Sequence, residues 1–197
     1  MKKQLSTNDF KGVYEGLAIN ISKLGCMMLD LEKMELNNSF YDGFTRFPIF
    51  EHLLYYTQDK EKFWINGFVA DKTPHVTLLY GLMQSAHNYK NYIENFLLKD
   101  WKMDDVEIDH FGYFESPYDD EPYYCIVAHI KVTPELLEGN QRMEFLPHIN
   151  TFAGYKPHFT IAYIKKDEVA RDNFIADLNL HHAGTKLKVT GYNFGKK

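Results

Sequence analysis

The sequence contains two copies of one short pattern, HVTLLY at residues 75–80 and HFTIAY at residues 158–163. Each copy follows a proline and is bounded by turn-forming residues, so each predicts a short, mostly apolar β-strand. Alternate residues of a strand point to the same face. The histidine and the threonine of each copy are therefore expected on one face, with apolar residues on the other. If the two strands face one another across a cleft, two imidazoles and two hydroxyls converge there.

The candidate catalytic residues are accordingly His75, Thr77, His158 and Thr160. Histidine has an unperturbed pKa of about 6.5, so one neutral and one protonated ring can act together as base and acid near neutral pH. Threonine hydroxyls on the same face are suited to hydrogen-bond the non-bridging oxygens of a phosphate. This set of groups is sufficient for phosphodiester cleavage without a metal ion. The sequence does not say which imidazole is the base.

The remaining sequence predicts an α+β fold in a single domain spanning residues 1–197. In chain order we expect a strand at 12–21, a loop-rich segment at 22–47, a short helix at 48–56, the first repeated strand at 74–80, a helix at 85–98, a hairpin of strands at 106–116 and 123–132, a helix from 134 to about 145 or 149, the second repeated strand at 156–164, a helix from 167 to 178 and a closing strand at 184–194. The element order of the first half roughly recurs in the second. We therefore expect duplicated lobes, at about 10–100 and 101–197, with antiparallel sheets flanked by helices around a central cleft.

Composition narrows the class of substrate. The formal net charge is −5, and the lysines are scattered. A protein that binds a long nucleic acid normally has a basic face or a net positive charge. The negative net charge of this chain therefore favours a small anionic substrate over a long nucleic acid. No apolar run is long enough to span a membrane, and no secretory signal follows the N-terminus, which favours a cytoplasmic protein. Neither the two cysteines nor the other histidines show a metal-binding spacing, so no metal and no cofactor is expected. No obligate protein partner is evident.

The paired motifs resemble those of the two-histidine (2H) phosphoesterase superfamily, also called LigT-like, and the element order is similar over roughly residues 10–195. The superfamily includes RNA 2′,3′-cyclic phosphodiesterases, the so-called 2′-5′ RNA ligases, and a phage enzyme that destroys the cyclic oligonucleotide messengers of CBASS antiviral immunity. The resemblance implies a duplicated two-lobe fold and a phosphodiesterase that works through the four residues named above.

Three functions remain open. The acidic charge, the compact domain and an aromatic-rich loop within residues 41–47 favour the phage-type (anti-CBASS) hydrolase of a cyclic nucleotide or oligonucleotide, acting in a host cytoplasm. An RNA-processing enzyme that acts on RNA ends as a 2′,3′-cyclic phosphodiesterase is the alternative, and it would use the same residues. A non-catalytic protein that sequesters nucleotides is the third.

Substrate-binding residues are predicted from side-chain type. Tyr14, Trp101 and Tyr155 are candidates for stacking on a nucleobase. Lys156 can add positive charge beside the second motif. Strand alternation places the last tyrosine of each motif, at 80 and 163, on the face opposite the histidines, where packing in the core is expected. The seven other histidines are interpreted as structural or surface residues.

Overall fold

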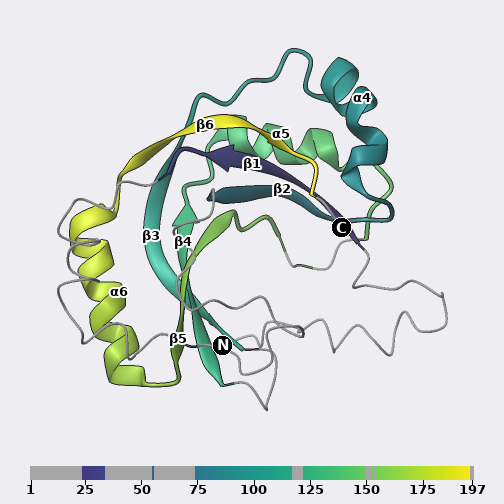
Figure 1. Cartoon of the computed structure of the whole chain (residues 1–197). Coiled ribbons are helices and arrows are strands. Elements are labelled where there is room, and N and C mark those ends of the chain that lie inside the picture. Colours follow the sequence, from purple (N-terminus) through teal and green to yellow (C-terminus); the bar gives the residue numbers. More distant parts are fainter. Residues whose placement is uncertain are drawn as a thin grey trace.

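The six strands of the computed structural model form one antiparallel sheet, in the order β2-β1-β6-β3-β4-β5. The model describes residues 24–33, 55, 74–116, 122–149, 152 and 154–195. The strands are β1 (Gly25–Leu31), β2 (His75–Leu82), β3 (Asp105–Glu115), β4 (Tyr123–Ile130), β5 (His158–Lys165) and β6 (Lys186–Asn193). Figure 1 shows β2, β1 and β6 across the top of the sheet and the long, bent β3 running down beside β4 and β5.

The helical segments are short 3₁₀ and π turns, η3 (Ala86–Tyr89) and η4 (Ile93–Leu97), on either side of α4 (Lys90–Tyr92), followed by α5 (Pro134–Met143) and α6 (Glu168–His182). In Figure 1, α6 runs beside the lower part of the sheet and α5 lies behind β6 and β1. Both long helices start where the sequence predicts. The Thr133 hydroxyl accepts a hydrogen bond from the Leu136 amide at 3.2 Å, and the Asp167 carboxylate accepts one from the Ala170 amide at 3.0 Å.

The predicted helix at 85–98 is irregular. Its inward residues Ile93 and Leu97 are buried as expected, but Tyr92 and Phe96 stack on one another at the surface, with ring centroids 5.3 Å apart. The Leu98 amide donates to the Ile93 carbonyl at 2.8 Å, which is the wider turn of a π-helix. The apolar stripe is therefore only half buried.

One strand falls where the sequence suggests none. β1 lies inside the segment at 22–47 that reads as loop-rich, and its residues alternate between buried and half-buried positions. The predicted strand at 12–21 lies outside the described residues, as does the predicted helix at 48–56 apart from Tyr55. The hairpin, both repeated strands and the closing strand are confirmed, with bounds shifted by a few residues.

The sheet is continuous across the boundary expected between the two lobes. The C-terminal strand β6 pairs with β1 over residues 28–31 and with β3 over residues 105–107. It therefore joins the β2-β1 pair to the β3-β4-β5 group in one continuous sheet. The α+β class is confirmed, and the duplication stays a prediction.

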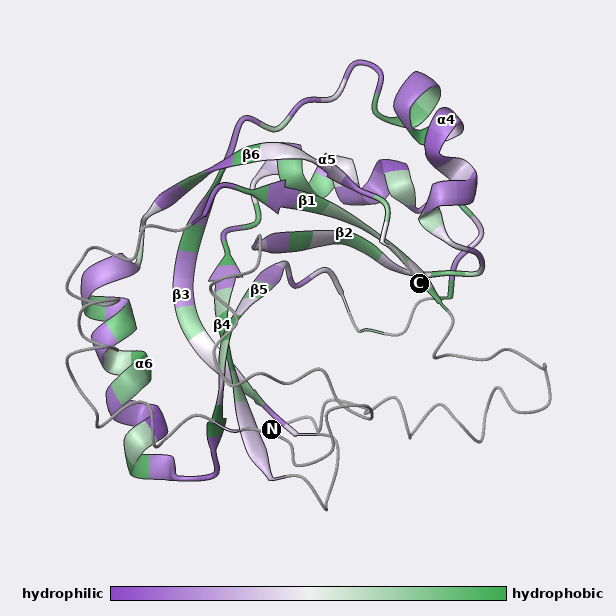
Figure 2. Cartoon of the chain, viewed as in Figure 1, coloured by the Kyte–Doolittle hydropathy of each residue, from purple (hydrophilic) through white to green (hydrophobic). Residues whose placement is uncertain are grey.

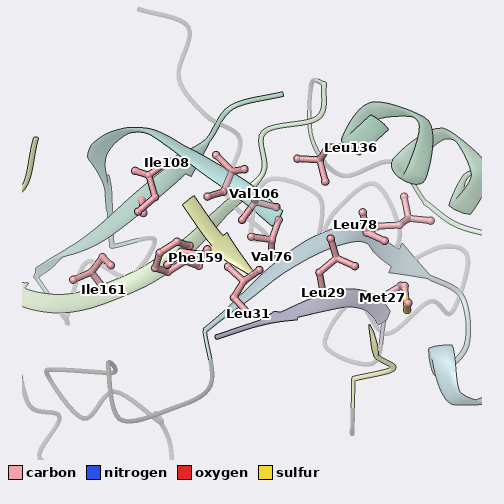
Figure 3. Packing of buried hydrophobic residues seen from close by; sticks show 14 of the residues in the cluster. Met27, Leu29, Leu31, Val76, Leu78, Val106, Ile108, Leu136, Phe159 and Ile161 are labelled. Atoms are coloured by element: carbon pink, nitrogen blue, oxygen red, sulfur yellow. The ribbon is translucent and has the colours of Figure 1, made fainter. Parts of the chain in front are cut away.

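Both repeated strands contribute to one hydrophobic core. Val76 and Leu78 of β2 and Phe159 and Ile161 of β5 are buried in a single cluster with residues of β1 and β3. Figure 3 shows these side chains pointing toward one another. The strands are thus apolar on the face away from their histidines, as alternation predicts. Figure 2 shows polar and apolar residues mixed along α6, in keeping with a helix that covers the sheet with one side.

The chain between α5 and β5 brings the two repeated strands together. The Ile149 amide donates to the Gly81 carbonyl at 2.8 Å, and the Met83 amide donates to the Pro147 carbonyl at 3.0 Å. Gly81 has a φ of +100°, and a side chain there would collide with the Ile149 carbonyl. The end of β2 is therefore held against the segment that leads into β5.

Candidate active site

A β-bulge follows the threonine of the first motif. Thr77 lies opposite Met28 of β1, and Tyr80 lies opposite Cys26. Three steps along β2 therefore match two steps along β1, and the extra residue moves Tyr80 onto the face of His75 and Thr77. The prediction that Tyr80 lies on the opposite face is wrong for this reason.

The second motif repeats the arrangement. Thr160 lies opposite Val127 of β4, and Tyr163 lies opposite Cys125, with the irregularity between them. Tyr163 therefore also shares the face of His158, contrary to the sequence prediction. Its hydroxyl lies close to the Thr160 hydroxyl and to the Cys125 thiol.

The Thr160 hydroxyl has two neighbours. Besides Tyr163, the Cys125 Sγ lies 3.8 Å from Thr160 Oγ1. Burial raises the pKa of Cys125 to about 11, so the thiol stays neutral at pH 7. The groups beside the Thr160 hydroxyl are therefore neutral, and none of them is an anion that would repel a phosphate.

The His158 ring has a fixed tautomer. Its Nδ1 lies 2.8 Å from the Lys156 carbonyl, which can only accept, so Nδ1 carries the hydrogen. The other nitrogen, Nε2, then carries the lone pair when the ring is neutral. Burial lowers the pKa of His158, and the charge of nearby His75 lowers it further, although the Lys156 carbonyl acts in the opposite sense. The His75 ring therefore lies close enough to influence the protonation of His158.

The first motif has a carboxylate as neighbour. His75 is exposed at the start of β2, and Asp30 of β1 lies directly opposite it in the ladder. Side chains in such pairs have Cβ atoms about 4.5–5.5 Å apart. Asp30 is itself positioned by Asn193, whose side-chain amide donates to Asp30 Oδ1 at 3.0 Å.

Two histidines that the sequence suggests are structural or surface residues, His129 and His110, lie in line with His158 across the sheet. His129 of β4 is directly opposite His158, with ring centroids 6.2 Å apart, and His110 of β3 is opposite His129. Phe114 of β3 meets the His158 ring edge-on at 4.9 Å. The signal that could have found them is strand register, which becomes readable only when the hairpin and its pairing to β5 are known.

The structure places the predicted substrate-binding residues in different surroundings. Tyr14 lies outside the described residues. Trp101 is only 3% exposed and its indole N–H donates to the Glu135 carbonyl at 2.8 Å, so it is a core residue with no face for a base. The Tyr155 hydroxyl donates to the Thr77 carbonyl at 3.1 Å, which bridges β2 and the approach to β5. Lys156 is exposed, and its charge is felt at His129.

Among the described residues, no three or more histidine, cysteine or acidic side chains are grouped so as to hold a metal ion. None of the described helices has both the length and the apolar character that crossing a membrane requires.

Comparisons with known proteins identify the fold. No protein-family model matches the sequence, and no curated protein is significantly similar to it. Among solved structures, Usb1 of the yeast Kluyveromyces marxianus aligns with a TM-score of 0.51 and 14% identity, covering 90% of this chain and 97% of that one. A second structure of that protein, with uridine monophosphate, aligns with a TM-score of 0.48 and 12% identity over 90% and 96% of the chains. The chain therefore has the mixed α+β fold of Usb1.

Proposed function

We propose that this chain is a phosphodiesterase of the two-histidine type that cleaves nucleotide or oligonucleotide substrates without a metal ion. The observation that carries the proposal is the proximity of the two motifs: β2 and β5 contact one another although they are the two edge strands of the sheet, and the Tyr155 hydroxyl, just before β5, donates to the Thr77 carbonyl. The fold that the chain shares with Usb1 supports it.

The surroundings of the two imidazoles favour different roles. His158 has a lowered pKa, a protonated Nδ1 and a neutral imidazole, His129, across the ladder. These features suit a general base that accepts a proton at Nε2 from the attacking hydroxyl or water. His75 has Asp30 across its ladder, and we assign it the general acid that protonates the departing oxygen. Thr77 and Thr160 hydrogen-bond the non-bridging oxygens.

The pH dependence follows from the direction of the His158 shift. A general base must be unprotonated, so kcat/KM falls as the pH drops through its pKa. Because the pKa of His158 is lowered, we expect the acidic limb of the kcat/KM profile to have its midpoint below the ordinary histidine value of about 6.5. The profile would be measured between pH 4 and 9 at constant ionic strength. An acidic limb centred above that value would contradict the assignment of His158 as base.

Two substrate classes follow from the proposal. The RNA-processing alternative, with 2′,3′-cyclic or other RNA ends as substrate, is the one that the likeness to Usb1 favours. Hydrolysis of a cyclic oligonucleotide messenger is the second, and it is supported by the acidic net charge of −5 and by the resemblance of the motifs.

A panel of substrates in EDTA tests the proposal and separates the classes. Cyclic dinucleotides and trinucleotides, nucleoside 2′,3′-cyclic phosphates, a 2′-5′-linked dinucleotide and short RNAs would be incubated with the protein and followed by chromatography. We expect cleavage of at least one substrate, unaffected by the chelator, and its loss in a chain that carries both His75→Ala and His158→Ala. Product from RNA or 2′,3′-cyclic ends alone supports RNA processing, and product from cyclic oligonucleotides alone supports messenger hydrolysis. Retention of a ligand without any product would indicate a sequestering protein instead.

A further inference from the structure

Three imidazole rings lie in a row across β3, β4 and β5. His110 is paired with His129 in one ladder, and His129 is paired with His158 in the next. The His110 and His129 rings are stacked with centroids 4.5 Å apart and planes inclined by 21°. The His129 and His158 centroids are 6.2 Å apart. The row starts at the proposed base and extends over two further strands.

Neighbouring residues fix the row in place. Phe114 meets both the His129 ring and the His158 ring edge-on, with centroid distances of 5.8 and 4.9 Å. Gly112 lies beneath the His129 ring, where a Cβ atom would come within 3.0 Å of Nε2. The absence of a side chain at Gly112 therefore makes room for the His129 ring, and Phe114 couples its position to that of His158.

Four titratable or charged groups face His129. On the β3 side it faces His110 and Asp109, and on the β5 side it faces His158 and Lys156. The one carboxylate among them is engaged, because Asp109 Oδ2 accepts a hydrogen bond from His110 Nδ1 at 2.7 Å. Burial, followed by the charges of His110 and His158, lowers the pKa of His129 to about 4. At pH 7 the His129 ring is neutral and keeps one N–H donor, and Lys156 is the permanent positive charge near it.

We propose that His129 and His110 bind a second phosphate of the substrate, the phosphodiester group next to the one that is cleaved at His158. Imidazole N–H groups and lysine can donate hydrogen bonds to phosphate oxygens, and the 6.2 Å between the His129 and His158 ring centroids is on the scale of one nucleotide step along a chain. This inference rests on the proposed function and narrows it. The substrate is an oligonucleotide, linear or cyclic, with at least two phosphates, rather than a mononucleoside cyclic phosphate.

Binding to an inactive chain tests the subsite without requiring turnover. The parent protein carries His75→Ala, which leaves the row intact. Its affinity would be measured by calorimetry for UpU, with one phosphate, and for UpUpU, with two. We expect UpUpU to bind more tightly. His129→Ala should weaken the binding of UpUpU about tenfold and that of UpU less than twofold, since one charge-assisted hydrogen bond is lost.

Further variants distinguish the loss of the phosphate subsite from a general loss of folding. His110 is exposed, so His110→Ala is expected to fold normally and to weaken UpUpU binding about threefold, in keeping with a second, more exposed donor. His129→Gln keeps a donor and should retain most of the affinity, while His181→Ala on α6 is a histidine control that should change nothing. Equal affinity of the parent for the two ligands, or an equal loss for both in His129→Ala, would overturn the proposal.

The outcome is distinguishable from failure of the proposed function. Binding of UpUpU that depends on His129, in a wild-type chain that cleaves no substrate of the panel, would keep the subsite and overturn the phosphodiesterase. Cleavage of a panel substrate, together with UpUpU binding that His129→Ala does not change, would keep the phosphodiesterase and overturn the subsite.

Discussion

Replacing His158 by alanine is expected to lower kcat/KM by about 10³-fold, because general acid–base catalysis by a positioned side chain contributes roughly 10²- to 10⁴-fold. His75→Ala should cause a similar loss on a substrate with an ordinary sugar hydroxyl as leaving group. The two variants should differ on uridine 3′-(4-nitrophenyl phosphate). Its leaving group is a stable anion that needs no proton, so His75→Ala should retain most activity there while His158→Ala does not.

The leaving-group comparison tests the assignment of roles and not just the need for both residues. Release of 4-nitrophenolate would be followed by absorbance in EDTA, with His181→Ala as a control of the same residue type and with thermal melting to show that each variant folds. The reverse pattern, with His158→Ala active on this substrate, would exchange the acid and the base. Full activity of both variants on every substrate would rule out the two-histidine mechanism.

The two repeated strands could be predicted because their information is local. Proline, histidine, threonine and the apolar residues of each copy specify both a strand and its two faces, and the structure buries Val76 and Phe159 while leaving His75 exposed. The caps at Thr133 and Asp167 are local in the same way, since each side chain binds an amide three residues later. Signals of this kind do not depend on the rest of the fold.

The tyrosines were assigned to the wrong face because a β-bulge is a property of a pair of strands. Strict alternation separates Thr160 from Tyr163 by an odd number of residues and so by a change of face. The ladder with β4 inserts one extra residue between them and restores the same face. Nothing within residues 158–163 alone specifies that insertion.

Strand β1 and the histidine row were missed because both depend on distant partners. The segment Gly25–Leu31 contains two methionines, a glycine and an aspartate, and it becomes a strand between β2 and β6. His110, His129 and His158 are separated along the chain and meet only through the register of two ladders. Trp101 illustrates the opposite case, since an aromatic ring that suits a nucleobase equally suits a core.

The threonine hydroxyls provide the second large expected effect. Thr160→Val removes the hydroxyl and keeps the shape of the side chain. If the hydroxyl donates to a phosphate oxygen that gains charge in the transition state, its loss costs about 2.7 to 4 kcal/mol, or about 10²- to 10³-fold in kcat. KM should change little, because the interaction strengthens mainly in the transition state. Thr160→Ser restores the donor and should recover most of the rate.

The variant Tyr163→Phe tests whether catalysis requires the Tyr163 hydroxyl to orient that of Thr160. The Tyr163 hydroxyl lies close to that of Thr160, and we expect a hydrogen bond between them to orient Thr160 when the substrate is bound. Removing the Tyr163 hydroxyl should then lower kcat about tenfold. Its effect should largely vanish when it is combined with Thr160→Val, since both changes act through one hydroxyl. The measurement is a double-mutant cycle on kcat, with Tyr155→Phe at the other motif as the matched change. If the effects of Tyr163→Phe and Thr160→Val were additive, Tyr163 would act independently of Thr160, and the hydrogen bond between them would have no part in catalysis.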